Sequence, residues 1–210
     1  MSHNLYVNGF SQSGAEHLAA ILNLTYPGRN MITTNMLSEQ FQNSMAYIVH
    51  TLGQDPDAIF LIAIREPVEC LEAAILLESE GPKRIPIEIS MDMLVKLYNT
   101  FHWELLDRDR VVLIPLSEML LSPNALIDRL EPILGYSNDE RAKLSDSEYL
   151  ESISTELANS WELRSITKSY GWNDRYLEPI SQQLNSGEYS NRLHLLNDLY
   201  TVLLSKALKG

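Results

Sequence analysis

The run AIFLIAI, from Ala58 to Ile64, constrains the fold more than any other stretch of this chain. All of its residues are apolar, so a strand formed here has no polar face to turn toward water. Strands of this kind occupy the centre of parallel sheets that are covered by helices on both faces. The run therefore predicts a buried central strand between two helical layers.

Two further apolar runs predict strands, one from Leu5 to Val7 that ends at Gly9 and one from Val111 to Leu116. Apolar residues at helical spacing follow the strands and also occupy the stretches between them. The predicted helices begin near Gly14, Ser38, Glu66, Leu94 and Pro123, and the last of these has Ser122 before it and Gly135 after it. Alternation of strands and helices indicates βαβ units, right-handed crossovers and a parallel sheet. The predicted fold class is α/β, with three layers.

The chain of 210 residues suits one domain with a sizeable core. We expect a βα core over residues 1–136 and a mainly helical portion over residues 137–210, in which apolar residues from Leu193 to Leu204 mark a last helix. The segments TYPGRNMITT and ESEGPKRIPIEIS contain glycine and proline and are interpreted as loops.

The charge and the apolar runs limit the partners and the location of the protein. A net charge of -12 argues against general nucleic-acid binding, which needs a basic face. No apolar run approaches the roughly 20 residues that span a bilayer. The N-terminus lacks a secretion signal, and a single cysteine, Cys70, fits a reducing compartment. We expect a cytoplasmic protein with no membrane partner, and the His, Cys and acidic residues show no metal-ligand spacing.

The stretch LYVNGFSQSGAEHL, from Leu5 to Leu18, is typical of a turn that holds a phosphate. Gly9 follows a strand-like run, and Gly14 precedes a helical pattern. Ligands of open α/β sheets bind at the C-terminal ends of the strands, and backbone N–H groups at a helix start attract anions. The loop is not a Walker A sequence because it lacks the Gly-Lys-Ser/Thr ending. The missing ending argues against a nucleotide kinase, which is the third and weakest hypothesis for the function of this chain.

Three stretches in order resemble the sulfotransferase family, which are P-loop relatives that use 3'-phosphoadenosine 5'-phosphosulfate (PAPS). The first, LYVNGFSQSGAEHLAAILN, resembles the family's strand, phosphosulfate loop and helix. AIFLIAIREPVECLEAAIL resembles the strand that ends in Arg-Asp/Asn-Pro. VVLIPLSEMLLSPNALIDRLEPILGY resembles the strand, acidic stretch, proline and helix that end in a Leu-Gly pair. The resemblance implies a P-loop-type parallel sheet and binding of PAPS or of its product, 3'-phosphoadenosine 5'-phosphate (PAP).

The resemblance also assigns candidate nucleotide-binding residues. They are the loop residues Gly9, Ser11, Gln12, Ser13, Gly14 and Ala15, together with Arg65, which matches the family's 3'-phosphate arginine. Gln12 stands where the family has a Lys or Arg that stabilises the leaving phosphate. Sulfuryl transfer needs positive charge at that point, and charge-assisted hydrogen bonds are about twice as strong as neutral ones.

Other departures from the family weaken the phosphate site. Ala15 and Glu16 replace two hydroxyl residues of the loop, and Ala73 replaces a serine of the 3'-phosphate site. A compensating cation would have to come from elsewhere, and the candidates are Lys83, Arg84 and Arg29.

Histidines near these segments have both catalytic and structural interpretations. His102 is a candidate general base for an acceptor hydroxyl, although a packing or surface role is the commoner one for a lone helix histidine. His17 lies just after the loop, and helix packing is its first interpretation, with hydrogen bonding to an anion second. Arg65 is a ligand residue or a cap of the strand end that pairs with Glu66 or Glu118.

Two functions remain open at this point. The leading hypothesis is an enzyme that transfers a sulfuryl group from PAPS to a hydroxyl or an amine. The alternative is a binding protein that kept the fold and lost the chemistry, because fold alone does not decide function. The acceptor and the oligomeric state are left open.

Overall fold

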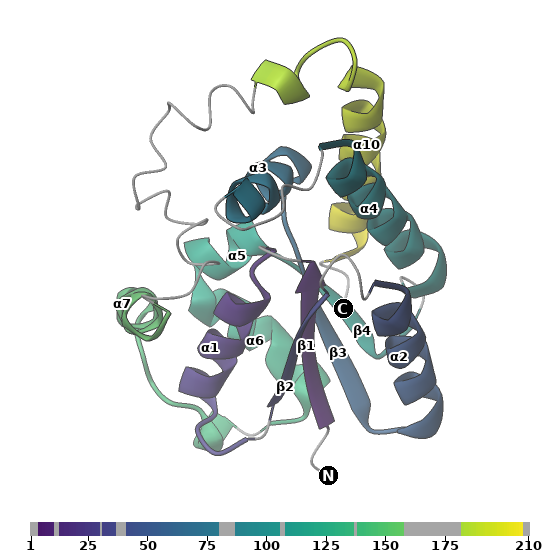
Figure 1. The fold of residues 1–210 in the computed structure, drawn as a ribbon. Coiled ribbons are helices and arrows are strands. Elements are labelled where there is room, and N and C mark those ends of the chain that lie inside the picture. Colours follow the sequence, from purple (N-terminus) through teal and green to yellow (C-terminus); the bar gives the residue numbers. More distant parts are fainter. Residues whose placement is uncertain are drawn as a thin grey trace.

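The computed structural model describes residues 4–10, 13–29, 31–36, 41–79, 87–105, 108–136, 138–157 and 182–207. Four parallel strands form one sheet in the order β2-β1-β3-β4 (Figure 1). The strands are β1 (Asn4–Phe10), β2 (Met31–Met36), β3 (Ala58–Ile64) and β4 (Val111–Pro115). β1 and β3 are the two inner strands of this sheet, and every side chain of β3 is buried, as the apolar run predicted.

Alternate side chains of β3 point into two separate cores, one on each face of the sheet. Ile59, Leu61 and Ala63 join the core cluster that also contains residues of α1. Phe60, Ile62 and Ile64 join the cluster on the opposite face. This two-residue period is the geometry of any extended strand, so a strand with two apolar faces requires cover on both.

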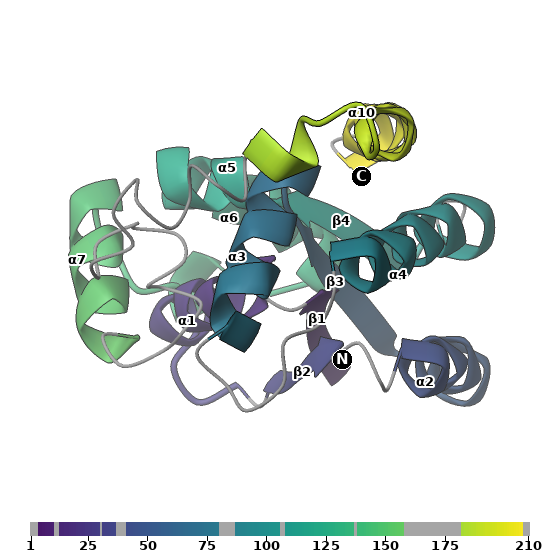
Figure 2. The same cartoon turned by 45° about the horizontal axis from the view of Figure 1, so that its top comes forward.

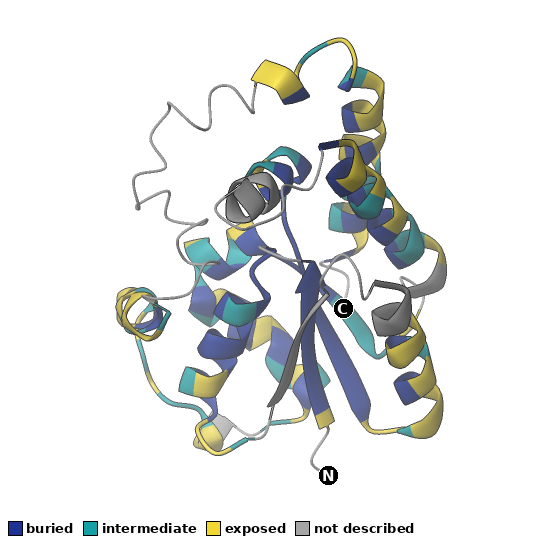
Figure 3. Cartoon of the chain, in the orientation of Figure 1, coloured by how far each residue is buried: buried dark blue, intermediate teal, exposed yellow. Residues whose placement is uncertain are grey.

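Helices supply that cover, and Figure 2 shows them on both sides of the sheet. The helices that bury residues in the first cluster are α1 (Ala15–Thr25), α5 (Leu116–Leu121), α6 (Pro123–Leu134) and α7 (Asp146–Glu156). Those that bury residues in the second cluster are α2 (Phe41–Gln54), α3 (Pro67–Ser79), α4 (Ile87–Thr100), the π-helix η2 (Phe101–Leu105) and α10 (Ser190–Ala207). The predicted three-layer α/β fold is confirmed, and β1 and β3 are largely buried between the helices in Figure 3.

Most of the predicted boundaries agree with the structure to within a few residues. β3 and the helix that starts at Pro123 match their predictions, and Gly135 ends that helix in the left-handed conformation with φ 64°. The helical pattern that begins near Ser38 predicts an end at Gly53, and α2 ends one residue later, at Gln54. The predicted loop ESEGPKRIPIEIS overlaps two helices, because α3 extends to Ser79 and α4 already begins at Ile87.

β2 is a strand that the sequence interpretation missed. The predicted loop TYPGRNMITT covers residues 31–34, but residues 31–36 pair in parallel with β1 from Leu5↔Met31 to Phe10↔Met36. The sequence MITTNM has too few apolar residues to read as a buried strand. Its position beside β1, at the end of the strand order, explains why a more polar sequence suffices there.

The C-terminal helix α10 is part of the core and contacts α3, α4, η2 and β4. Leu193, Leu196 and Leu203 are buried in the cluster on that face. The helices α7 and α10, which follow residue 136, each bury side chains beside those of the βα portion. No helix among the described residues has the length and apolar character needed to cross a bilayer.

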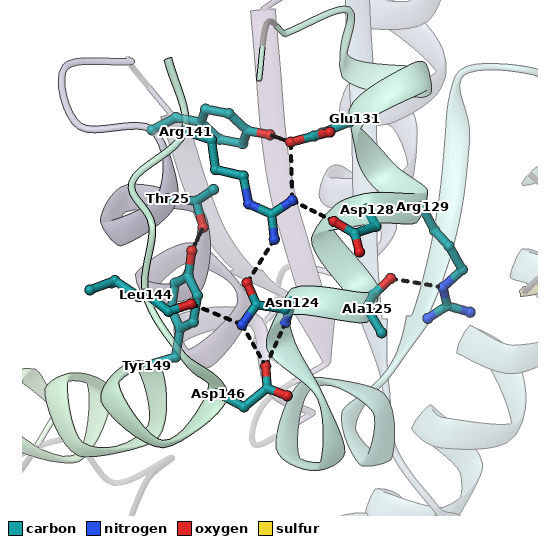
Figure 4. A network of polar contacts seen from close by, with 11 residues as sticks. Thr25, Asn124, Ala125, Asp128, Arg129, Glu131, Arg141, Leu144, Asp146 and Tyr149 are labelled. Atoms are coloured by element: carbon teal, nitrogen blue, oxygen red, sulfur yellow. Dashed lines mark hydrogen bonds and ion pairs between the residues drawn. The ribbon is translucent and has the colours of Figure 1, made fainter. Parts of the chain in front are cut away.

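A polar network joins α6, α7 and the end of α1 on the outer side of the first face (Figure 4). Asp146 accepts hydrogen bonds from the backbone N–H of Asn124 at 2.8 Å and from the hydroxyl of Ser122 at 2.9 Å. Arg141 pairs with Asp128 and donates to the side-chain oxygen of Asn124 at 2.7 Å. Asp128 and Glu131 balance the positive charge of Arg141. The network therefore stabilises the packing of the helices and offers no excess positive charge to a ligand.

Candidate functional site

The predicted sequence of strand, turn and helix is present at the end of β1. The backbone N–H of Ser13 donates to the carbonyl of Phe10 at 2.9 Å and closes a tight turn. Gly14 then adopts the left-handed conformation, with φ 106°, and Ala15 is the first residue of α1. The described part of the loop therefore delivers the N-terminal end of α1 to the C-terminal edge of the sheet. Ser11 and Gln12 lie outside the described residues.

Glycine is needed at Gly9, near the end of β1, and at Gly14, before α1, for steric reasons. A Cβ on Gly9 would lie 2.2 Å from Ser13 Oγ, so the serine side chain occupies the space above the strand. A Cβ on Gly14 would lie 2.8 Å from Leu116 Cδ1, in addition to the strain of a positive φ. Because α5 carries Leu116, it packs against this junction and fixes the entry to α1.

Ser13 is the loop side chain with the most informative environment. The residue is 1% exposed, and its Oγ has no hydrogen-bond partner among the described residues. A buried hydroxyl without a partner costs free energy, so such atoms often mark a position that a ligand or a bound water satisfies. A hydroxyl at the start of a helix, beside a glycine cradle, fits a phosphate oxygen.

Glu16 and His17 follow in the first turn of α1. Glu16 is partly buried, and a negative charge in a first helical turn is stabilised by the helix dipole. His17 is 2% exposed, and burial lowers the pKa of its imidazole to about 4. The imidazole is therefore neutral at pH 7 and adds no positive charge to the loop, in agreement with its expected packing role.

Arg65 follows the last residue of β3, at the same edge of the sheet as the loop. The strand register pairs Gly9 of β1 with Ala63 of β3, so the segments that follow these two strands leave the sheet at adjacent positions. The side chain of Arg65 is 4% exposed, and its Nε lies 3.3 Å from Oε2 of Glu69 in the first turn of α3. The hydroxyl of Tyr98, on α4, donates to the backbone carbonyl of Arg65 at 2.5 Å.

The carboxylates near Arg65 have roles that the sequence interpretation had not assigned. Glu66 accepts the backbone N–H of Glu69 at 2.8 Å and so caps the start of α3. Glu118 pairs with Arg129 on α6. The ion pair of Arg65 with Glu69 has the helical spacing i, i+4, which the sequence alone could have revealed. Nothing in the sequence marks the hydrogen bond from Tyr98, which lies 33 positions away.

The strand order places the loop and Arg65 at a switch point of the sheet. From β1 the chain passes through α1, on one face, to β2 on one side of β1. From β3 it passes through α3 and α4, on the other face, to β4 in the opposite direction. The connections after the neighbouring strands β1 and β3 therefore diverge to opposite faces. In open α/β sheets, ligands bind in the crevice that such a divergence creates.

The other candidate residues do not gather at this point. His102 lies in η2, next to Phe101, which is buried in the core on the face opposite α1, and η2 packs on α10. The imidazole ring of His102 packs edge-on against the indole of Trp103, with 4.8 Å between the ring centroids. Arg29 lies beyond the far end of α1, where it pairs with Glu140 at 2.6 Å. An 11-residue helix separates it from the loop, so Arg29 does not supply the missing cation.

Two proposed cations, Lys83 and Arg84, lie outside the described residues. Ala73, which replaces the family's second 3'-phosphate residue, is buried at 2% exposure in α3. Among the described residues, no group of three His, Cys, Asp or Glu side chains is placed to hold a metal ion. Within this part of the chain, Arg65 is thus the well-placed cation at the switch point.

The fold and the site define a class: an α/β protein with a candidate anion-binding loop at the switch point of a parallel sheet. Among solved structures, the chain is similar to the mouse sulfotransferase SULT7A1 complexed with PAP. The TM-score is 0.51 at 11% sequence identity, over 91% of this chain and 88% of the mouse chain. This likeness shows a sulfotransferase-like fold. No family model and no curated protein sequence matches the chain.

Proposed function

We propose that this protein binds a 3'-phosphoadenosine nucleotide at the switch point between β1 and β3 and transfers the sulfuryl group of PAPS to a hydroxyl or amine acceptor. The observation that carries the proposal is the pairing of two features at one sheet edge. One is the buried, unsatisfied Ser13 hydroxyl beside Gly14 at the start of α1, and the other is Arg65 after the adjacent strand. A solved structure of similar fold contains PAP, which supports the same ligand class.

Different residues of the chain bind the 5'-phosphate and the 3'-phosphate of the nucleotide. The start of α1 offers backbone N–H groups and the positive end of the helix dipole to the 5'-phosphate. Ser13 donates its hydroxyl to the same group. Arg65, whose backbone is held by Tyr98, pairs with the 3'-phosphate.

The chemical step depends on hydrogen bonds more than on charge. PAPS supplies the sulfuryl group, and negative charge accumulates on the phosphate that leaves. Gln12 replaces a cation at that point and, as a neutral amide, donates a weaker hydrogen bond. We therefore propose that transfer is slow compared with that of enzymes that have a loop lysine. His102, in η2, remains a proposed general base for the acceptor.

The partners in this proposal are small molecules, namely the nucleotide and an acceptor of unknown structure. Neither a nucleic acid nor a membrane takes part. Binding without transfer is the alternative function, and the same experiment detects it.

Isothermal titration with PAP tests the binding site. Wild-type protein is expected to bind PAP weakly, and Arg65→Ala is expected to weaken binding further by about ten- to a hundredfold. That loss corresponds to removal of one charged hydrogen-bond partner, about 1.5–3 kcal/mol. Gln12→Lys is expected to strengthen binding, and Gln12→Ala to change it little.

Arg192→Ala is the control for loss of charge, because it removes an arginine from an exposed ion pair between α10 and Asp92 of α4. It should bind PAP as the wild type does. Equal losses in the two arginine variants would place the site elsewhere. Release of PAP from PAPS, measured with phenol and amine acceptors, then separates transfer from binding alone. Absence of PAP binding in every variant, including Gln12→Lys, would refute the proposed function.

A further inference from the structure

Glu69 and Arg65 form an ion pair in which the two side chains lie at different depths in the protein. Its Oε2 lies 3.3 Å from Nε of the arginine, and the two side chains differ strongly in exposure, at 47% for Glu69 and 4% for Arg65. The arginine is enclosed by the protein, whereas the carboxylate lies at the surface.

We propose that Glu69 is an internal counter-ion that competes with the 3'-phosphate of the nucleotide for Arg65, an inference that rests on the function proposed above. In the protein without nucleotide, the carboxylate neutralises the buried guanidinium, which would otherwise be costly. When the nucleotide binds, its phosphate replaces the carboxylate, and Glu69 turns into solvent. The nucleotide then gains only the difference between the two interactions.

The two residues differ in how firmly the structure holds them, and this difference makes the exchange possible. The backbone of Arg65 is held by the hydroxyl of Tyr98, a fully buried residue whose ring stacks with Phe101 and Tyr200. Glu69 lies in the first turn of α3 and is half exposed, so its carboxylate can be hydrated after rotation about the side-chain bonds. Because its backbone is held and its side chain is enclosed, Arg65 moves less than Glu69 when its partner changes.

Competition of this kind makes the site selective for a nucleotide that carries a 3'-phosphate. A single phosphate at the start of α1 leaves the pair of Arg65 and Glu69 intact and gains nothing from it. A dianionic 3'-phosphate carries more charge than the carboxylate and forms a bidentate pair with arginine. Adenosine 5'-phosphate (AMP) and PAP differ only in this group, so their affinities report on Glu69 directly.

The test compares PAP and AMP affinities, by isothermal titration at constant ionic strength, for the wild type and Glu69→Gln. The variant is expected to bind PAP about three- to tenfold more tightly, because it lacks both the competitor and its repulsion of the phosphate. AMP affinity should stay within about 1.5-fold of wild type, because AMP does not reach Arg65. Glu69→Ser should act in the same direction, which keeps the test valid if one variant folds poorly.

Glu140→Gln is the matched control, since Glu140 also pairs with an arginine, Arg29, and has a similar side-chain exposure of 44%. It should change neither affinity. Equal PAP affinity in Glu69→Gln and Glu140→Gln would overturn the inference, as would equal tightening of PAP and AMP. Wild-type binding of PAP with no effect of Glu69 refutes only the inference. Failure of every variant to bind PAP refutes the proposed function together with it.

Discussion

His17 is buried in α1 with the pKa of its imidazole lowered to about 4, and this has a consequence for stability. In the unfolded chain a histidine titrates at about pH 6.5. Between these two values the unfolded chain binds a proton that the folded protein does not, so the free energy of unfolding decreases as the pH falls. Above about pH 6.5 both states are neutral, and the histidine contributes no pH dependence.

The first prediction follows from this difference in pKa. From about pH 6.5 to about pH 4, His17 should reduce the free energy of unfolding by about 3 kcal/mol. His17→Gln should remove that part of the pH dependence, while the contribution of the carboxylates remains. Urea denaturation at pH 7, 6, 5 and 4 measures both proteins. Identical pH profiles would show that His17 becomes protonated in the folded protein as readily as in the unfolded chain.

At the scale of elements, the junction between the loop and α1 depends on the left-handed conformation of Gly14. Gly28, after the same helix, is also left-handed, with φ 94°. The two glycines differ in their surroundings. A Cβ on Gly28 would meet no atom within 4 Å, whereas one on Gly14 would meet Leu116 Cδ1 at 2.8 Å. An alanine at Gly28 would therefore add only backbone strain, whereas an alanine at Gly14 would add the same strain and a steric clash.

Gly28→Ala should cost about 1 kcal/mol of unfolding free energy, through strain alone. Gly14→Ala should cost about 2–4 kcal/mol, because the clash with α5 is added to the same strain. Chemical denaturation measures both variants. Equal costs would mean that α5 moves aside easily and does not fix the start of α1.

On the scale of the whole molecule, α10 completes the core on one face of the sheet from the far end of the chain. Leu196 is fully buried there, while its neighbour Leu195 is 45% exposed. The position of α10 against α4 and β4 predicts that it unfolds together with the sheet. That behaviour would fit the expected single domain.

Leu196→Ala should lower the free energy of unfolding by about 2–5 kcal/mol, as a large-to-small change in a core does. Leu195→Ala should change it by less than about 1 kcal/mol, because the side chain is largely in water already. Tryptophan fluorescence and far-UV circular dichroism should show one coincident unfolding transition for each protein. Two separate transitions, with only one shifted by Leu196→Ala, would indicate that α10 belongs to a separate folding unit.

Local patterns in the sequence predicted the elements whose causes are local. The run from Ala58 to Ile64 specified β3 and its cover on both faces, since a strand with no polar side needs two apolar neighbours. Gly14 specified the turn before α1, because a left-handed residue strongly favours glycine. Both conclusions depend only on the residues within the segment and on the geometry of the backbone.

Only the tertiary structure decided the features that need distant partners. Residues 31–36 form β2 because β1 offers them hydrogen bonds in register, not because their own sequence is strongly strand-like. The hydroxyl of Tyr98, on α4, donates a hydrogen bond to the backbone of Arg65. Arg29 pairs with Glu140 beyond the C-terminal end of α1, whereas the loop lies at its N-terminal end. A sequence pattern records the preferences of neighbouring residues, whereas these contacts depend on which segments the packing of helices on the sheet brings together.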